Sequence, residues 1–317
     1  MSEAFETPIE ICGPLRAPRQ MLGDQEYDGH ASLHDDATAE RLGFSAGPIE
    51  GPTHFSQFDP LAVSVWGREW FETGCISAHY RNMVFEGEEV RAFFERPTGG
   101  ARQVRIRAEK ADGTEVLIGT ASVGGDNPPT ELENRIAGLR PPGPLVILHG
   151  NEVGMKGAVV ERVRMDHDQH MGDLYPFSLA QKLEAITEPS PWYGEGGGDS
   201  PWGRGVVPIE MISVLMQYTS HQAGWPTRGP AIGLFAGLQI RLVDGPVFVG
   251  EDYEIEREII ALSESRRVES RWVLSTLRRA SDAGVVAEMI VNSATLKESY
   301  EPYDRELAEL MEAGAAP

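Results

Sequence analysis

The sequence predicts an α+β protein of two similar halves, each an antiparallel sheet wrapped around one buried helix. A short pattern occurs twice, as VFEGE at 84–88 and as VFVGE at 247–251. Alternating apolar residues and a hairpin turn follow each copy, and a long apolar segment precedes each copy. A sheet closed over a helix buries the apolar faces of both elements, so this arrangement accounts for all three observations.

The strands of both halves follow from alternation. Val90, Ala92 and Phe94 alternate with polar neighbours, which is the period of a half-buried strand. Asp112-Gly113 then separates two further alternating runs and predicts a hairpin, because Gly accepts a positive φ. The second half repeats this order, with alternation at 253–257 and a turn at 282–284.

The apolar segments at 53–66 and 209–221 have helical spacing, and the second is apolar nearly all round, which is typical of a buried helix. Pro60 predicts that the first helix kinks or starts late. We therefore expect an N-terminal half at 1–125, a Pro-rich linker crossing the surface at 126–154 and a C-terminal half at 155–298. The acidic tail at 299–317 is expected to form a short helix or to be loose.

The 317 residues include 28 Lys and Arg against 49 Asp and Glu, a net charge of −21. This balance disfavours nucleic acid and anionic membranes as partners. The chain has no apolar run of about 18 residues, and its N-terminus lacks the segments of a signal peptide. Its two cysteines, Cys12 and Cys75, cannot form a disulfide framework. A cytoplasmic location is therefore expected.

Residues 39–51 read AERLGFSAGPIEG and follow His34 closely. This order of a His, a small helix, a Gly-Phe turn and a Pro-Ile…Gly entry into an apolar helix resembles the MaoC-like (R)-specific enoyl-CoA hydratases. The resemblance covers roughly 10–125 and 155–297 and implies a double hotdog fold. It further implies a hydro-lyase that adds or removes water across a double bond of an activated acyl group, with an acyl-CoA thioester as substrate. No metal or redox cofactor is implied.

The chain departs from the family motif, Asp-x-Asn-Pro-x-His. Counting back from His34, Gly29 stands at the Asp position, and Asp28 comes one residue too early. Either a one-residue insertion still lets Asp28 reach the site, or the Asp of the pair is lost. At the equivalent point of the second half the spacing is kept, but Glu188 replaces the Asp and Tyr193 replaces the His.

Hydration of an enoyl thioester needs a base for water, a proton for the α-carbon and a donor to the thioester oxygen. The resemblance assigns the proton work to His34, with Asp28 as its candidate partner. The N–H of Gly51, at the start of the buried helix, is the predicted oxyanion donor. Pro208 stands at the same point of the second half and has no N–H, which favours the first half as the active one. Glu188 as base and Tyr193 as carbonyl donor form the alternative pair.

Five further residues are predicted to bind the substrate. Glu50 and Glu210 stand at the two helix entries, and His54 lies one turn after Glu50. Trp192 and Trp202 flank the Gly-rich loop at 194–198, which we interpret as a lid carrying aromatic side chains. His167 and His170 have the His-x-x-His spacing, but no further ligand supports them, so no metal site is predicted.

Other functions remain open at this stage. A hotdog thioesterase also needs a carboxylate, a water and a helix-end amide. The altered pairs also suit a lyase acting on a small non-CoA substrate, or a non-catalytic ligand-binding or partner protein. The fused halves fit a monomer and a homodimer equally well.

Overall fold

The computed structural model describes residues 7–25, 32–41 and 46–314. Its strands form one antiparallel sheet in the order β1-β3-β4-β5-β2-β7-β10-β9-β8-β6. From either edge to the middle, the two halves run through their strands in the same sequence, 1-3-4-5-2 and 6-8-9-10-7. The halves therefore share one topology, and they join where β2 pairs with β7.

The strand bounds are as follows. The first half contributes β1 (Glu10–Cys12), β2 (Gly74–Tyr80), β3 (Val90–Glu95), β4 (Gln103–Lys110) and β5 (Glu115–Val123). The second half contributes β6 (Glu161–Val163), β7 (Gly233–Leu242), β8 (Tyr253–Glu264), β9 (Val268–Arg279) and β10 (Val285–Leu296). Alternation is confirmed in β3, where Val90, Ala92 and Phe94 are buried, and at the start of β8, where residues 253, 255 and 257 are buried. In β9 the predicted face is wrong, because Trp272 packs on the outer side of the sheet and Leu274 is only half-buried.

The helices of the first half are α1 (Asp36–Arg41), η1 (Gly51–Phe58), α2 (Asp59–Trp66) and α3 (Glu69–Thr73). Those of the second half are α5 (Leu179–Ala185), η2 (Pro191–Tyr193), η3 (Glu195–Gly197), α6 (Ile209–Leu215), η4 (Ser220–Ala223) and η5 (Lys297–Ser299). The linker contains α4 (Glu131–Ala137), and the chain ends in α7 (Tyr303–Gly314).

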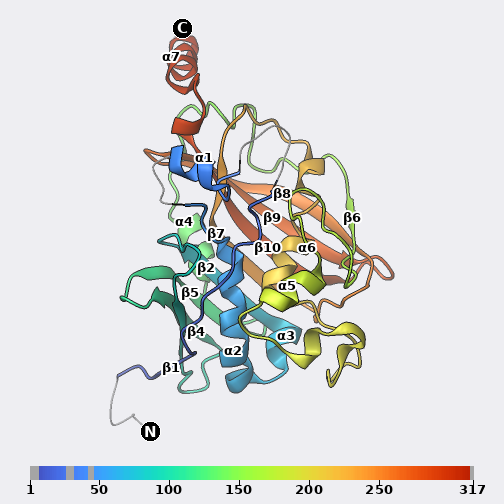
Figure 1. The fold of residues 1–317 in the computed structure, drawn as a ribbon. Coiled ribbons are helices and arrows are strands. Elements are labelled where there is room, and N and C mark those ends of the chain that lie inside the picture. Colours follow the sequence, from blue (N-terminus) through green and yellow to red (C-terminus); the bar gives the residue numbers. More distant parts are fainter. Residues whose placement is uncertain (1–6, 26–31, 42–45, 315–317) are drawn as a thin grey trace.

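The sheet wraps around two central helical segments (Figure 1). The first half contributes η1 followed by α2, the second half contributes α6, and η1 and α6 contact each other. All seven residues of α6 are buried, as its apolar sequence predicts. Side chains from both halves form one continuous apolar core. The two five-stranded halves of this one sheet, each wrapped on a buried helix, form a double hotdog, so the predicted fold class is confirmed.

The helices differ from prediction in length. The first segment opens as the 3-10 helix η1, and α2 begins only at Asp59 with Pro60 in its first turn. Proline is tolerated there because the first N–H groups of a helix have no partner within the helix. The second segment ends its α-helix at Leu215 and passes through turns into η4.

The two hairpins use different residues for their turns. Gly113 has the expected positive φ of 85°. In the second hairpin the positive φ of 60° falls on Ala283, and Gly284 instead donates its N–H to Asp282 Oδ1 at 2.9 Å. Both predicted hairpins are therefore present, with the positive φ on a glycine in the first and on an alanine in the second.

The segment at 126–154, predicted to be a linker that crosses the surface, contains a helix that packs on the sheet. Thr130 and Glu133 cap the start of α4 reciprocally, each side chain accepting from the backbone N–H of the other. Leu132 is fully buried and packs with Trp272 and Ile290 on the outer face of the sheet. The linker is thus a packed element of the fold.

The tail forms the helix α7, which projects at one end of the molecule (Figure 1). Tyr300 and Tyr303 anchor it against Val146 and Ile147 of the linker. Within the described ranges, no helix combines the length and hydropathy needed to cross a bilayer.

Candidate active site

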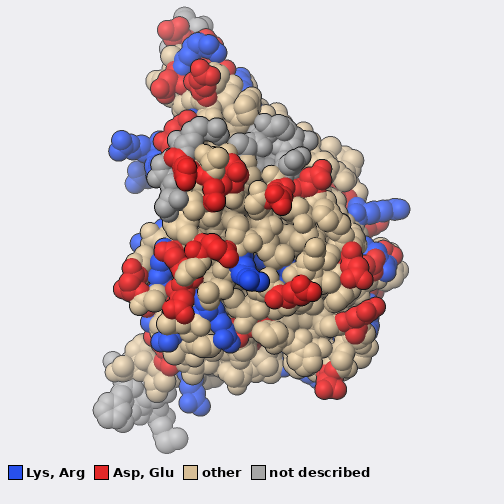
Figure 2. All heavy atoms as spheres, viewed as in Figure 1, with Lys and Arg blue, Asp and Glu red and all other residues tan. Residues whose placement is uncertain are grey.

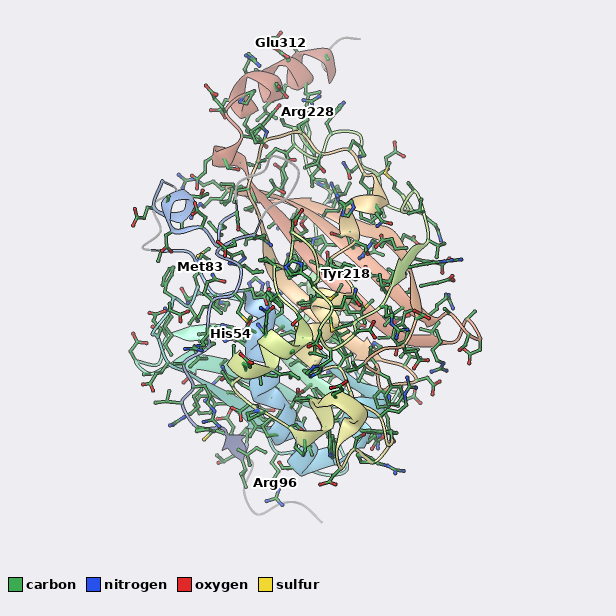
Figure 3. The ribbon with its side chains drawn as sticks, turned by 45° about the vertical axis from the view of Figure 1, so that its right-hand side comes forward. His54, Met83, Arg96, Tyr218, Arg228 and Glu312 are labelled. Atoms are coloured by element: carbon green, nitrogen blue, oxygen red, sulfur yellow. The ribbon has the colours of Figure 1, made fainter. Side chains whose placement is uncertain are left out.

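A cavity of about 1630 Å³ lies between the two halves. The first half lines it with residues 32–35, the start of η1 and the end of β2. The second half lines it with residues 171–175 and 217–225 and with parts of β7, β9 and β10. Figure 3 labels three lining residues near the middle of the molecule, His54, Met83 and Tyr218.

His34 is held in one tautomer by the backbone. Its Nδ1 lies 2.6 Å from the carbonyl oxygen of Pro48, so Nδ1 carries the proton and donates. This leaves Nε2 as an unprotonated acceptor on a residue that lines the cavity. Burial lowers the pKa of His34, against the smaller opposing effects of the Pro48 carbonyl and Glu50. The imidazole is therefore neutral at physiological pH, as a general base must be.

Close backbone packing brings His34 to this position. A Cβ on Gly47 would lie 2.1 Å from the carbonyl oxygen of His34, so only glycine lets the two loops approach so closely. The N–H of Gly47 also donates to Asp36 Oδ1 at 2.8 Å. The Gly-Pro-Ile segment of the sequence thus places the Pro48 carbonyl beside the imidazole.

Gly51 begins η1 and lines the cavity, and its N–H has no acceptor within the helix because it is the first residue. The ring of Tyr80 covers its Cα, and a Cβ there would lie 2.4 Å from the Tyr80 Cζ. The Tyr80 hydroxyl is buried without a partner among the described residues. Burial and the nearby Glu50 hold the pKa of Tyr80 well above its usual value, so the hydroxyl keeps its proton.

His54, on η1, also lines the cavity, and its Nδ1 is buried with no partner in the described part of the chain. Burial, together with Lys182 and Lys110, lowers the pKa of His54 to about 4. Neutral polar groups that lack protein partners thus converge where η1 begins. Buried polar groups are normally satisfied, so such a cluster is typical of a ligand site.

A cluster of buried charged side chains lies next to the start of η1. Lys182 Nζ is 3.4 Å from Glu50 Oε1 and 3.7 Å from Glu210 Oε1, and it donates to Thr53 Oγ1 at 3.0 Å. Burial raises the pKa of Glu210 to about 7, although Lys182 opposes the shift. Burial disfavours the charge on Lys182, but the two carboxylates raise its pKa above the usual value. Glu50 lines the cavity, whereas Glu210 lies behind it.

The alternative pair from the second half lies elsewhere. Glu188 binds Arg16 through two hydrogen bonds of 2.6 and 3.1 Å. Tyr193 is buried and donates to Asp59 Oδ2 at 2.9 Å. Neither residue lines the cavity described here.

The two predicted lid tryptophans pack on the protein itself. Trp192 and Trp202 stack edge to face at 5.6 Å, and both contact Phe71. Trp202 Nε1 also donates to Glu72 Oε1 at 3.3 Å. Neither residue lines the cavity.

Asp28 lies outside the described residues. Four residues of the predicted site line the cavity together, namely His34, Glu50, Gly51 and His54. Four others do not line it, namely Glu188, Tyr193, Trp192 and Trp202. The structure adds Tyr80, which the sequence analysis missed because a Tyr at a strand end carries no motif. Among the residues that the structure describes, no group of three or more His, Cys, Asp or Glu could hold a metal ion.

No protein-family model and no curated protein sequence matches the chain. Solved structures do resemble it. One is a MaoC-like dehydratase, with 15% identity and a TM-score of 0.47 over 82% of this chain and 87% of the other. A conserved hypothetical protein from Mycobacterium tuberculosis with a double hotdog fold has 13% identity and a TM-score of 0.48, over 80% and 84%.

A third similar structure is the dehydratase domain of PpsC from Mycobacterium tuberculosis, solved in complex with C12:1-CoA. It has 14% identity and a TM-score of 0.42, over 93% of this chain and 97% of the other. At such identities the likeness concerns the fold and not the reaction.

Proposed function

We propose that the chain catalyses the reversible addition of water to the double bond of an acyl thioester, at the site formed by His34 and Gly51. The observation that carries the proposal is the tautomer of His34. Its Nδ1 is committed to the Pro48 carbonyl at 2.6 Å, so a basic Nε2 belongs to a residue that lines the same cavity as Gly51.

In the hydration direction, Nε2 of His34 accepts a proton from a water molecule as its oxygen bonds to the β-carbon. Electron density moves onto the thioester oxygen, which the Gly51 N–H stabilises by a hydrogen bond. The imidazolium then returns the proton to the α-carbon, so water adds to one face and the histidine is regenerated. The charge of Glu50 favours the transient imidazolium, since it opposes the lowering of the His34 pKa by burial.

Hydration of a panel of trans-2-enoyl-CoA esters, followed by loss of enoyl absorbance, tests the proposal. We expect His34→Ala to lower kcat/KM by about 10²-fold or more, the usual contribution of a general acid–base group. His149→Ala is the matched control, because His149 is exposed and lies outside the cavity. Asp28→Asn tests whether Asp28 acts with His34, which we propose on the family resemblance alone.

The same assay separates the competing reactions. Release of free thiol without hydration would identify a thioesterase. An inert wild-type protein across the panel would overturn the acyl-CoA hydratase proposal and direct attention to non-CoA substrates. Equal activity of wild type and His34→Ala would show that His34 is not the base.

A further inference from the structure

Arg271 lies on β9, on the face of the sheet that points into the cavity. Its neighbour Trp272 faces the opposite way and packs with Leu132 on the outer surface. Two and four positions further along β9, Val273 and Ser275 are buried. Alternation along the strand therefore directs the guanidinium inward.

The protein satisfies the Arg271 guanidinium only in part. Nη2 donates to Thr227 Oγ1 at 2.8 Å and faces the Pro226 carbonyl at 3.4 Å, and the guanidinium carbon lies 5.3 Å from the centre of the Trp225 ring. Nε is buried without an acceptor. Among the described residues, no carboxylate lies within ion-pair distance of Arg271. Burial lowers the pKa of Arg271 to about 10, so the group stays cationic at neutral pH.

Arg257, a buried arginine on neighbouring β8, shows the contrasting case. Its Nε and Nη2 each donate to the Glu161 carboxylate at 2.7 Å, its Nη1 donates to Ser275 Oγ and its Nη2 also reaches the Met216 carbonyl. A buried arginine that supports the fold is thus fully paired here. Arg271 is half-buried and has no counter-charge among the described residues, so it lacks the structural reason that Arg257 has.

We propose that Arg271 is an anion-binding subsite of the same cavity, and that the substrate is an acyl thioester carrying an anionic oxygen group that this guanidinium binds. The inference rests on the proposed function for the thioester and extends it to the substrate class. Arginine is suited to the role because its planar fork pairs with carboxylate and phosphate oxygens.

The overall charge makes a dedicated cation necessary for such a ligand. The chain carries a net charge of −21, and acidic side chains are spread over the face drawn in Figure 2. This field repels an anion from most of the surface. A cation inside the cavity, partly removed from solvent and from screening, offsets that repulsion locally.

The anionic group has two sources on an acyl thioester, a phosphate of the carrier thiol or a carboxylate at the far end of the acyl chain. Calorimetric titration with three probes separates them: crotonyl-CoA, crotonyl-pantetheine without phosphate, and glutaconyl-pantetheine with a terminal carboxylate. Each probe is titrated into wild type, Arg271→Met, Arg271→Lys and Arg278→Met. Arg278 is the matched control, because it lies on the same strand outside the cavity and pairs with Glu256.

We expect Arg271→Met to weaken one anionic probe by roughly 10-fold or more, the size of a lost charge-assisted hydrogen bond. Binding of crotonyl-pantetheine should change less than 2-fold, Arg271→Lys should retain part of the affinity, and Arg278→Met should bind as wild type does. Weakening of crotonyl-CoA identifies the phosphate, and weakening of glutaconyl-pantetheine identifies the carboxylate.

Equal binding of both anionic probes by wild type and Arg271→Met overturns the subsite, and so does wild-type protein that binds neither. Turnover is measured separately on the same samples. Arg271-dependent binding without hydration would leave the subsite in place and reject the hydratase proposal, so the two failures are distinguishable.

Discussion

Glu210 offers a direct test of the buried charge cluster. Its carboxylate is almost fully buried, and Lys182 Nζ lies 3.7 Å from its Oε1. Burial raises its pKa from 4.5 to about 7. The folded state therefore binds a proton more tightly than the unfolded state does, and this group makes the protein lose stability as pH rises from about 4.5 to about 7.

Glu210→Gln removes the titration and keeps the shape of the side chain. A shift from 4.5 to about 7 corresponds to about 3 kcal/mol of penalty on the charged form. At pH 8 the variant should therefore be more stable than wild type by about 3 kcal/mol, and at pH 5 by only about 1 kcal/mol, because Glu210 is then protonated in the folded state.

Urea denaturation of both proteins between pH 5 and pH 8 measures this difference. His34 and His54, whose pKa values are lowered, change stability in the opposite direction below about pH 6.5, but they act equally in both proteins. Glu256→Gln, an exposed carboxylate paired with Arg278, serves as the control and should show no growing gap. Parallel curves for wild type and Glu210→Gln would refute the reasoning.

Three further predictions concern packing and hydrogen bonds. Gly51→Ala should cost about 1–3 kcal/mol of unfolding free energy, because the new Cβ meets the Tyr80 ring at 2.4 Å, and the cost should shrink in a Tyr80→Ala background. Tyr193→Phe removes a donor from Asp59, whose pKa burial raises to about 7. It should cost about 1–3 kcal/mol, more at pH 8 than at pH 6 because the bond favours the charged carboxylate. Leu132→Ala should cost about 2–5 kcal/mol by opening a cavity under α4.

Urea midpoints measure all three variants. Additive effects of the Gly51 and Tyr80 substitutions would contradict the steric argument. A loss for Tyr193→Phe that does not vary with pH would show that the hydroxyl does not stabilise the charged Asp59. An unchanged midpoint for Leu132→Ala would mean that the linker helix adds nothing to the stability of the sheet.

Much of the fold is predictable from local pattern. Alternation at Val90, Ala92 and Phe94 fixes which face of β3 is buried, because the side-chain period of a strand is two. The lengths of the helices are harder to predict from the sequence, since packing of η1 against α6 decides where a 3-10 turn gives way to an α-helix. The linker helix did carry a signal in Thr130 and Glu133, the spacing of a capping box, but the flanking prolines favoured a loop instead.

In the candidate site, too, residues in a local motif are predictable from the sequence, whereas residues brought in from distant segments are not. His34, Glu50 and Gly51 lie within one short stretch of chain, so a local motif could identify them. Lys182 of α5 contacts Glu50, and Arg271 of β9 lines the cavity, and only the three-dimensional arrangement reveals these neighbours. The motif spacing assigns Tyr193 to the His position of the second half, yet its hydroxyl donates to Asp59, because spacing does not specify where a side chain points.

The pairing of β2 with β7 has a consequence for how the two halves could diverge. In an assembly of two identical hotdog subunits, every substitution appears at both symmetry-related positions, so neither copy can change its chemistry alone. Joining the halves in one polypeptide removes that constraint. Here Gly51 keeps its N–H at one helix entry while Pro208 stands at the other. A titration should accordingly saturate at one ligand per chain, although the architecture is built from two copies of the same unit.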